Sequence, residues 1–230
     1  MLDLELKGIL RMHPHVPHRA RPVTPNILLV FHRVMDHEDP LHCSVWACSL
    51  FLFYTLSRLG SMLPTSGSTP RHQFLTKDRV NLSIEGLLVT FLHTKTIQFG
   101  KRRLHIPLLR SDSVLCPVKA YLWASSRSSG HHSGPAFTFI KKGKVSWLTS
   151  SIFIKTFRGV LAHAGVEGAS SFTGHSFRRG GATWAFQAGV PGELIQICGD
   201  WASDAYKRYL EFSMENKLKL AARFTQNLPC

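Results

Sequence analysis

The stretch that most constrains the fold runs from Val45 to Leu56 and consists almost entirely of apolar side chains. Asp39 and Pro40 precede it, and this pair is a helix-start signal, because the carboxylate caps backbone N–H groups and proline fits the first turn. We therefore expect one helix from Pro40 to Leu56, ending near Arg58. A helix that is apolar all round must be buried on every side, and this stretch is too short to cross a bilayer. The pattern predicts the central helix of a globular core.

Apolar periodicity on both sides of this helix predicts further helices and one small sheet. Thr24 and Pro25 repeat the start signal and open a helix to about residue 36. Alternating apolar residues between 79 and 106, with a turn at Glu85-Gly86, indicate a small antiparallel sheet. Further elements are expected as a hairpin of 137–139 with 145–147 and as helices from about 117, 150, 176, 191 and 203. Together they predict a single α+β domain that is mainly helical.

The C-terminal third has the clearest helical pattern. A helix over 176–188 is expected to bury one face, made of Phe177, Gly181, Trp184, Ala185 and Ala188. The next helix begins at Pro191 and carries apolar side chains at Leu194, Ile195 and Cys198. A turn is expected at Gly199-Asp200-Trp201, after which Ser203 caps a last helix that carries Tyr206 and Tyr209.

These elements divide the chain into one domain and two tails. We assign residues 23–215 to the domain, 1–22 to a basic tail and 216–230 to a C-terminal tail. His13, His15 and His18 lie close together in the first tail. Because no cysteine or acidic residue accompanies them, a solvated tail is favoured over a metal site.

Charge and cysteine content narrow the class of partner and compartment. Lys and Arg total 28 against 14 Asp and Glu, a formal net charge of +14, which favours a polyanion such as nucleic acid or an anionic membrane. The N-terminus lacks the basic-then-apolar order of a secretory signal. A disulfide framework or zinc ribbon is not indicated, and a reducing compartment is expected, because the cysteines are scattered and odd in number: Cys43, Cys48, Cys116, Cys198 and Cys230.

Five separated motifs carry a resemblance to a known family. The strongest is the run from Thr173 to Ala182, which contains His175-Ser176-Phe177-Arg178 and is followed by Cys198-Gly199-Asp200-Trp201 and by Ser203 to Tyr209. Upstream lie Ser57-Arg58-Leu59-Gly60 and His93-Thr94-Lys95-Thr96. In this order the motifs resemble the catalytic domain of phage-integrase-type tyrosine recombinases, and most of all the recombinases of Crypton and DIRS-type mobile elements. The resemblance covers about residues 20–215.

The resemblance implies a DNA breaking-rejoining enzyme with a covalent intermediate. Tyr209 is expected to attack the scissile phosphate, forming a 3′-phosphotyrosyl link and releasing a 5′-hydroxyl, so that rejoining needs no ATP. Arg58 and Arg178 are expected to bind the non-bridging oxygens, a task that suits planar guanidinium groups.

Three further residues complete the implied site. Lys95 is expected to protonate the leaving 5′ oxygen, and His175 to assist proton transfer from the tyrosine or to hydrogen-bond the phosphate. Trp201 stands where many relatives have histidine, and its indole N–H can donate to a phosphate oxygen while its bulk packs the tyrosine helix. The resemblance implies no metal or other cofactor. The implied partner is double-stranded DNA, bound by a homo-oligomer during synapsis, and no membrane.

Each of these residues has an ordinary structural explanation when taken singly. Arg58 is explained as a dipole partner at a helix end, Lys95 as a solvated hairpin residue and His175 as a helix cap. Trp201 and Tyr209 are explained as core residues, so that only the joint order of the set favours catalysis. Tyr206 competes with Tyr209, because spacing of three residues puts both on nearly the same helical face. The match of the Tyr-Leu ending favours Tyr209.

The chain departs from the family in two ways. Ser61 stands where relatives often have an acidic residue, three positions after the first arginine. Relatives also carry an N-terminal core-binding domain that clamps the duplex, whereas residues 1–22 leave room only for a remnant of its last helix, at Leu4 to Leu10. The chain is then a fragment, a decayed element or a domesticated copy, with salt-sensitive DNA binding.

Three functions follow from this pattern. The first is site-specific strand exchange for a mobile element, the second a non-catalytic DNA-binding module of the same fold, and the third a relaxing topoisomerase. A nuclear location is expected if the host is eukaryotic and a cytoplasmic one otherwise. Lys101-Arg102-Arg103 is too short for an import signal and is expected to face DNA or solvent from the sheet.

Overall fold

The computed structural model describes residues 20–97, 102–128, 132–210 and 218, apart from the side chain of Tyr209. The three tail histidines at 13, 15 and 18 and the stretch Leu4 to Leu10 lie outside the described residues. Most of the two predicted tails, residues 1–22 and 216–230, also lies outside the described residues.

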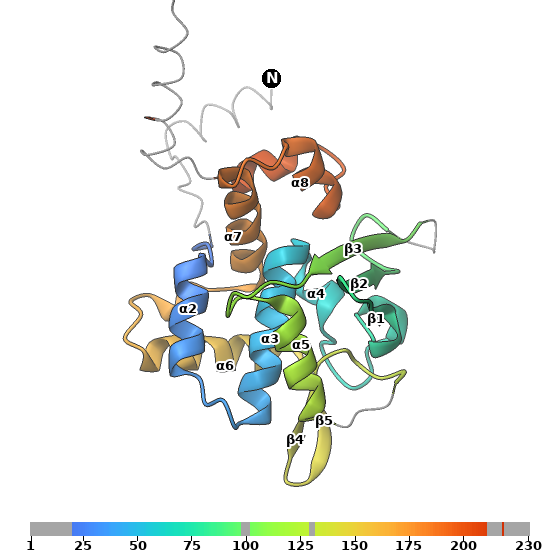
Figure 1. Ribbon diagram of the computed structural model, residues 1–230, viewed down its shortest axis with the longest axis vertical. Coiled ribbons are helices and arrows are strands. Elements are labelled where there is room, and N and C mark those ends of the chain that lie inside the picture. The colour runs from blue at the N-terminus through green and yellow to red at the C-terminus, as the bar shows by residue number, and fades with distance from the viewer. Residues whose placement is uncertain (1–19, 98–101, 129–131, 211–217, 219–230) are drawn as a thin grey trace, which may run out of the picture.

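The predicted central helix is α3, Pro40–Thr55, and it occupies the middle of the molecule (Figure 1). An Asp39 carboxylate oxygen accepts a hydrogen bond from the backbone N–H of Leu41 at 2.8 Å, as a capping residue should. The helix is buried along nearly its whole length. It ends at Leu56, whose φ of 52° lies in the left-handed region and turns the chain sharply. The prediction of a central core helix is confirmed.

Helices surround α3 on most of its sides. Helix α2 (Pro25–Val34) and helix α6 (Ser150–His163) lie to one side of it, and helix α5 (Pro117–Ser126) packs along it (Figure 1). Helix α7 (Gly174–Gln187) and helix α8 (Gly192–Cys198) lie at one end. The shorter elements are α4 (Leu59–Met62) and the 3-10 helices η1 (Arg71–Gln73), η2 (Lys77–Arg79), η3 (Ala169–Ser171) and η4 (Asp204–Tyr209).

Two small antiparallel sheets complete the fold and confirm the predicted α+β class. Strands β1 (Val80–Leu82), β2 (Gly86–Phe91) and β3 (Leu104–Leu109) form a sheet in that order. Strands β4 (Thr138–Lys141) and β5 (Lys144–Trp147) form the predicted hairpin, at the end of the molecule opposite α8 (Figure 1). The connection between β2 and β3 carries Lys95, so the sheet brings that residue to the edge of the helical core.

An aromatic cluster ties α7 to the core. The ring of Phe177 lies 4.8 Å from that of Phe157 and 5.3 Å from that of Phe153, measured between centroids. Phe157 in turn stacks on Phe31 at 5.1 Å. Such pairs contribute about 0.5–1.5 kcal/mol each beyond the area that they bury. Phe177 therefore fixes the helix on which two predicted site residues lie.

The predicted buried face of α7 is wrong in its second half. Trp184 is 46% exposed and Ala188 is exposed, whereas Arg178 and Arg179 are buried. Only the first half of α7 packs against α3 and the segment that precedes α2, and the second half extends beyond them (Figure 1). The helix also begins at Gly174, two residues earlier than predicted, and the Ser176 hydroxyl accepts a hydrogen bond from the backbone N–H of Thr173 at 2.9 Å.

Candidate active site

Arg58 is positioned by the tight turn that ends α3. After the left-handed turn at Leu56, Arg58 adopts extended backbone and stands as the N-cap of α4. Its half-buried side chain lines a cavity of about 530 Å³ together with Gln73, Lys95 and His175. The turn at the end of the central helix therefore places Arg58, the first predicted arginine, in the wall of this cavity.

Lys95 reaches the same cavity from the β2–β3 connection. The backbone N–H of Thr94 donates to the carbonyl of Ile97 at 3.0 Å, which makes the connection a tight loop. The Thr94 hydroxyl accepts from the N–H groups of Thr96 and Ile97 at 3.2 and 3.0 Å. Lys95 is exposed at the tip of this loop.

His175 is the second residue of α7 and lines the cavity beside Arg58. Partial burial lowers the pKa of its imidazole below the ordinary value of 6.5, and the positive charges of Arg178 and Arg58 lower the pKa further. The ring is therefore neutral at neutral pH, when it can accept a proton.

Arg178 lies one turn further along α7 and is 1% exposed. Its Nη1 donates to the carbonyl oxygen of Leu56, and the centre of its guanidinium lies 3.7 Å from the centroid of the Trp201 ring. A cation over the face of an indole is attracted by the ring electrons, most strongly where water is excluded. Arg178 also lines a small cavity with Arg58, which continues the site inward.

Trp201 follows a tight turn after α8 and is 8% exposed. Its ring packs between Arg178 and Tyr206, with 6.2 Å between the two aromatic centroids. Gly199 is required here, because a Cβ at that position would overlap the Trp201 ring. Five predicted site residues, Arg58, Lys95, His175, Arg178 and Trp201, are thus brought together in one region of the fold.

The two candidate tyrosines lie on η4, which is a 3-10 helix instead of the predicted α-helix capped by Ser203. The Ser203 side chain makes no capping hydrogen bond. Tyr206 is 6% exposed and belongs to a small apolar cluster with Trp201 and Ile195. Its hydroxyl lies close to Gly192. The side chain of Tyr209 lies outside the described residues, so its role as nucleophile stays a prediction.

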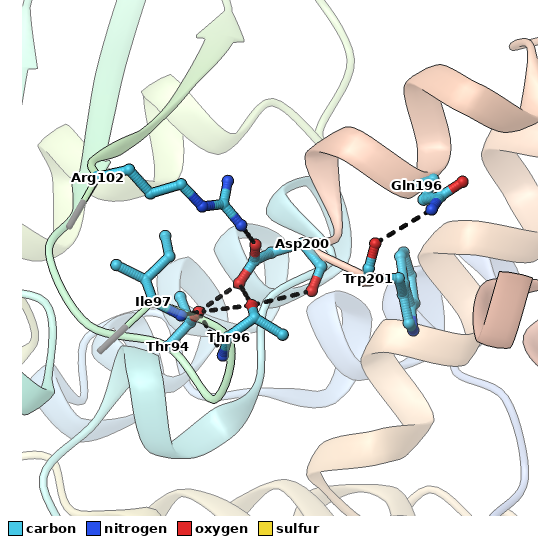
Figure 2. Close-up of polar contacts among 7 residues, drawn as sticks. All are labelled: Thr94, Thr96, Ile97, Arg102, Gln196, Asp200 and Trp201. Atoms are coloured by element: carbon cyan, nitrogen blue, oxygen red, sulfur yellow. Dashed lines mark hydrogen bonds and ion pairs between the residues drawn. The ribbon is translucent and has the colours of Figure 1, made fainter. Parts of the chain in front are cut away.

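Asp200 lies among the predicted site residues but was not predicted as one of them from the sequence. Its buried carboxylate accepts hydrogen bonds from the hydroxyls of Thr94 and Thr96 and pairs with the guanidinium of Arg102 (Figure 2). The side chain of Arg102 is 53% exposed, which agrees with the expectation of a solvent-facing residue, and its guanidinium also pairs with Asp200. Thr94 and Thr96 flank the predicted Lys95 in the sequence. Their position beside that lysine was the one sequence feature that linked these threonines to the site.

The described residues offer no group of three or more His, Cys, Asp and Glu side chains placed to hold a metal ion. Cys43, Cys48, Cys116 and Cys198 are not in disulfides. In this part of the chain we also find no helix with the length and apolar character to cross a membrane.

No family model and no curated protein matches the chain, whereas solved structures do. The XerH site-specific recombinase in its post-cleavage complex with palindromic difH substrate is 15% identical, with a TM-score of 0.60 over 89% of this chain and 52% of that one. The XerA recombinase is 17% identical, with a TM-score of 0.59 over 91% and 66%. A lambda integrase dimer bound to a COC′ core site is 13% identical, with a TM-score of 0.59 over 83% and 59%.

The chain thus spans about half to two thirds of the length of each of these structures. The matches extend over most of this chain. This chain has the fold of the tyrosine recombinase catalytic domain.

Proposed function

We propose that the chain cleaves and rejoins double-stranded DNA through a 3′-phosphotyrosyl intermediate formed by Tyr209. The observation that carries this proposal is the clustering of Arg58, Lys95 and His175 around one cavity, next to a buried Arg178. The likeness to DNA-bound recombinase structures and the net charge of +14 support DNA as the partner. The motifs further favour a mobile element of the Crypton or DIRS type, acting as a homo-oligomer on DNA.

The two arginines would stabilise the transition state. As the tyrosine oxygen approaches phosphorus, negative charge gathers on the non-bridging oxygens, and donors already in place lower the energy of that charge. Arg178 meets this condition because Leu56 and the Trp201 ring hold its guanidinium in one orientation. Arg58 adds a second guanidinium at the mouth of the site.

Lys95 and His175 would move the protons. The bond from phosphorus to the 5′ oxygen breaks as the bond to the tyrosine oxygen forms. Lys95 then gives a proton to the departing oxygen, because an alkoxide is a poor leaving group. His175 accepts the tyrosine proton, a role that requires the neutral imidazole. In rejoining, the same groups exchange roles.

The lowered pKa of His175 predicts the pH dependence of cleavage. The rate of adduct formation should rise with pH along a limb centred below pH 6.5, because protonated His175 cannot accept the tyrosine proton. His175→Asn should be slower and should lack this limb, whereas His163→Asn, on α6, should keep it. Single-turnover rates between pH 5 and 8 make the measurement. A limb centred above 6.5, or one that survives in His175→Asn, would contradict the assignment.

A suicide-nicked duplex tests the proposed function. Cleavage beside a nick releases a short 5′-hydroxyl fragment that diffuses away, so the protein stays attached to DNA and can be separated on a denaturing gel. Because the target sequence is unknown, a pool of nicked duplexes with random sequence is used as probe. We expect a covalent adduct from the parent chain.

The alternative function gives a different result in the same assay. Ser61, in place of an acidic residue, favours a DNA-binding module that has lost catalysis. Such a module would bind the pool with an affinity that falls steeply with salt, and it would yield no adduct. Binding without any adduct would therefore overturn the proposed enzyme, and relaxation of supercoiled DNA by the monomer would indicate a topoisomerase.

A further inference from the structure

A buried carboxylate joins the loop of Lys95 to the turn of Trp201. The side chain of Asp200 is 3% exposed. It accepts hydrogen bonds from the hydroxyls of Thr94 and Thr96, the residues on either side of Lys95 (Figure 2). The Thr96 hydroxyl also lies 3.3 Å from the carbonyl oxygen of Asp200. Two successive contacts of this kind restrain the loop at both sides of the lysine.

Because the Asp200 carboxylate is charged and buried, it requires the partners that the lysine loop and Arg102 provide. A carboxylate withdrawn from water is costly unless charged and hydrogen-bonding partners compensate for the lost hydration. Here Arg102 supplies the opposite charge and the two threonines supply hydroxyl donors. Hydrogen bonds to an ionised acceptor are about twice as strong as neutral ones. The negative charge of Asp200 therefore strengthens the hydrogen bonds that hold the Lys95 loop, in addition to any packing of the loop.

The same turn holds the arginine side of the site. Asp200 has a φ of 54°, a conformation that aspartate tolerates better than most residues, and Trp201 follows at once. The N–H of Trp201 donates to the Gln196 carbonyl at 3.1 Å. The side-chain amide of Gln196 donates to the Trp201 carbonyl at 3.2 Å, as Figure 2 shows. Trp201 stacks on Arg178 while Asp200 anchors the lysine loop. One rigid turn thereby fixes two separate parts of the site.

We propose that Asp200 is a positioning residue that sets the place of Lys95 relative to Arg58 and Arg178. The proposal rests on the proposed function, since it assigns Asp200 a task in DNA cleavage. Arg58, Arg178, Thr94 and Asp200 line the same small cavity, so a shift of the loop changes the place of Lys95 relative to both arginines. In Asp200→Asn the charge is lost, and the amide N–H groups face other donors.

Cleavage rates distinguish this task from a general contribution to stability. Asp200→Asn should cleave an ordinary nicked duplex about 10- to 100-fold more slowly than the parent, because general-acid assistance is weakened. A duplex with sulfur in place of the bridging 5′ oxygen needs no such assistance, since a thiol is far more acidic than an alcohol. On that substrate the variant should match the parent within about threefold. Lys95→Ala with Asp200→Asn should be no slower than Lys95→Ala alone.

Asp112→Asn is the matched control. It removes the same charge from an exposed carboxylate that pairs only with Lys119 at 3.3 Å among its described contacts, and it should cleave both substrates at the parent rate. If Asp200→Asn stays slow on the sulfur substrate, Asp200 acts elsewhere and the proposal is overturned.

Hydrogen exchange tests the anchoring without any cleavage. The amides of Thr94 and Ile97 close the loop, and in Asp200→Asn they should exchange roughly tenfold faster than in the parent or in Asp112→Asn. Unchanged exchange in Asp200→Asn would overturn the anchoring even if the chain proves inactive. If the parent gives no adduct but Asp200→Asn shows the faster exchange, only the proposed function is overturned. Thr96 is exposed as a residue, and Thr96→Val removes one hydroxyl donor to Asp200. This variant should show the same changes in smaller degree and serves if Asp200→Asn does not fold.

Discussion

Arg178→Lys is expected to lower the rate of adduct formation by about 100- to 1000-fold, the usual effect of removing one transition-state donor. The reason is that lysine keeps the charge but not the geometry. A guanidinium is planar, so it can lie against the Trp201 ring, donate to the Leu56 carbonyl and still present further N–H groups from the same plane. An ammonium group on a flexible chain cannot combine these contacts.

The neighbouring Arg179 offers a matched control for this prediction. It is also buried, at 8% exposure, but its Nη1 donates to the carbonyl of Ala20 at 3.1 Å, on the N-terminal segment. Arg179→Lys should therefore change the free energy of unfolding as much as Arg178→Lys does, while the rate of adduct formation stays near the parent value. Equal rates for the two variants would show that Arg178 is a structural residue alone.

Gly181→Ala is expected to lower the free energy of unfolding by about 3 kcal/mol, at the upper end of the usual cost of overpacking. A Cβ at Gly181 would overlap the carbonyl oxygen of Phe53, which belongs to the backbone of α3 and cannot turn aside. Helix α7 would have to move away from α3, and Arg178 would move with it. Denaturant unfolding gives the stability, and the rate of adduct formation should fall with it.

Gly159→Ala separates this effect from the general consequences of a glycine substitution. Gly159 lies inside α6, and a Cβ there would meet nothing within 4 Å. Because alanine favours a helix more than glycine does, the variant should be more stable by roughly 0.5–1 kcal/mol. A loss of stability at Gly159 equal to that at Gly181 would show that close approach of α7 to α3 is not the cause.

Much of the fold was predictable because its signals are local. Asp39-Pro40 and Thr24-Pro25 mark the starts of α3 and α2, and in both helices the capping side chain accepts a backbone N–H. Helix α6 follows the same rule from Thr149. Five of the predicted site residues lie together because the ordered motifs reflect the fold on which they are placed. Tyr209 is the sixth, and its placement remains a prediction.

The remainder depends on contacts that sequence periodicity does not contain. Trp184 was placed inward because its spacing from Phe177 suits a buried face, but α7 extends past its neighbours and leaves Trp184 exposed. Asp200 was taken as a turn residue, and its partners Thr94 and Arg102 lie about a hundred positions away in the chain. A contact of that range is set by the whole fold.

The most direct test of the central claim is to identify the residue that carries DNA in the trapped adduct. Parent, Tyr209→Phe and Tyr206→Phe chains are incubated with the nicked duplex, and the adducts are digested to peptides and analysed by mass spectrometry. We predict a nucleotide phosphate on Tyr209 in the parent, the same adduct in Tyr206→Phe, and none in Tyr209→Phe. An adduct that persists in Tyr209→Phe, or one that maps to Tyr206, would contradict the account.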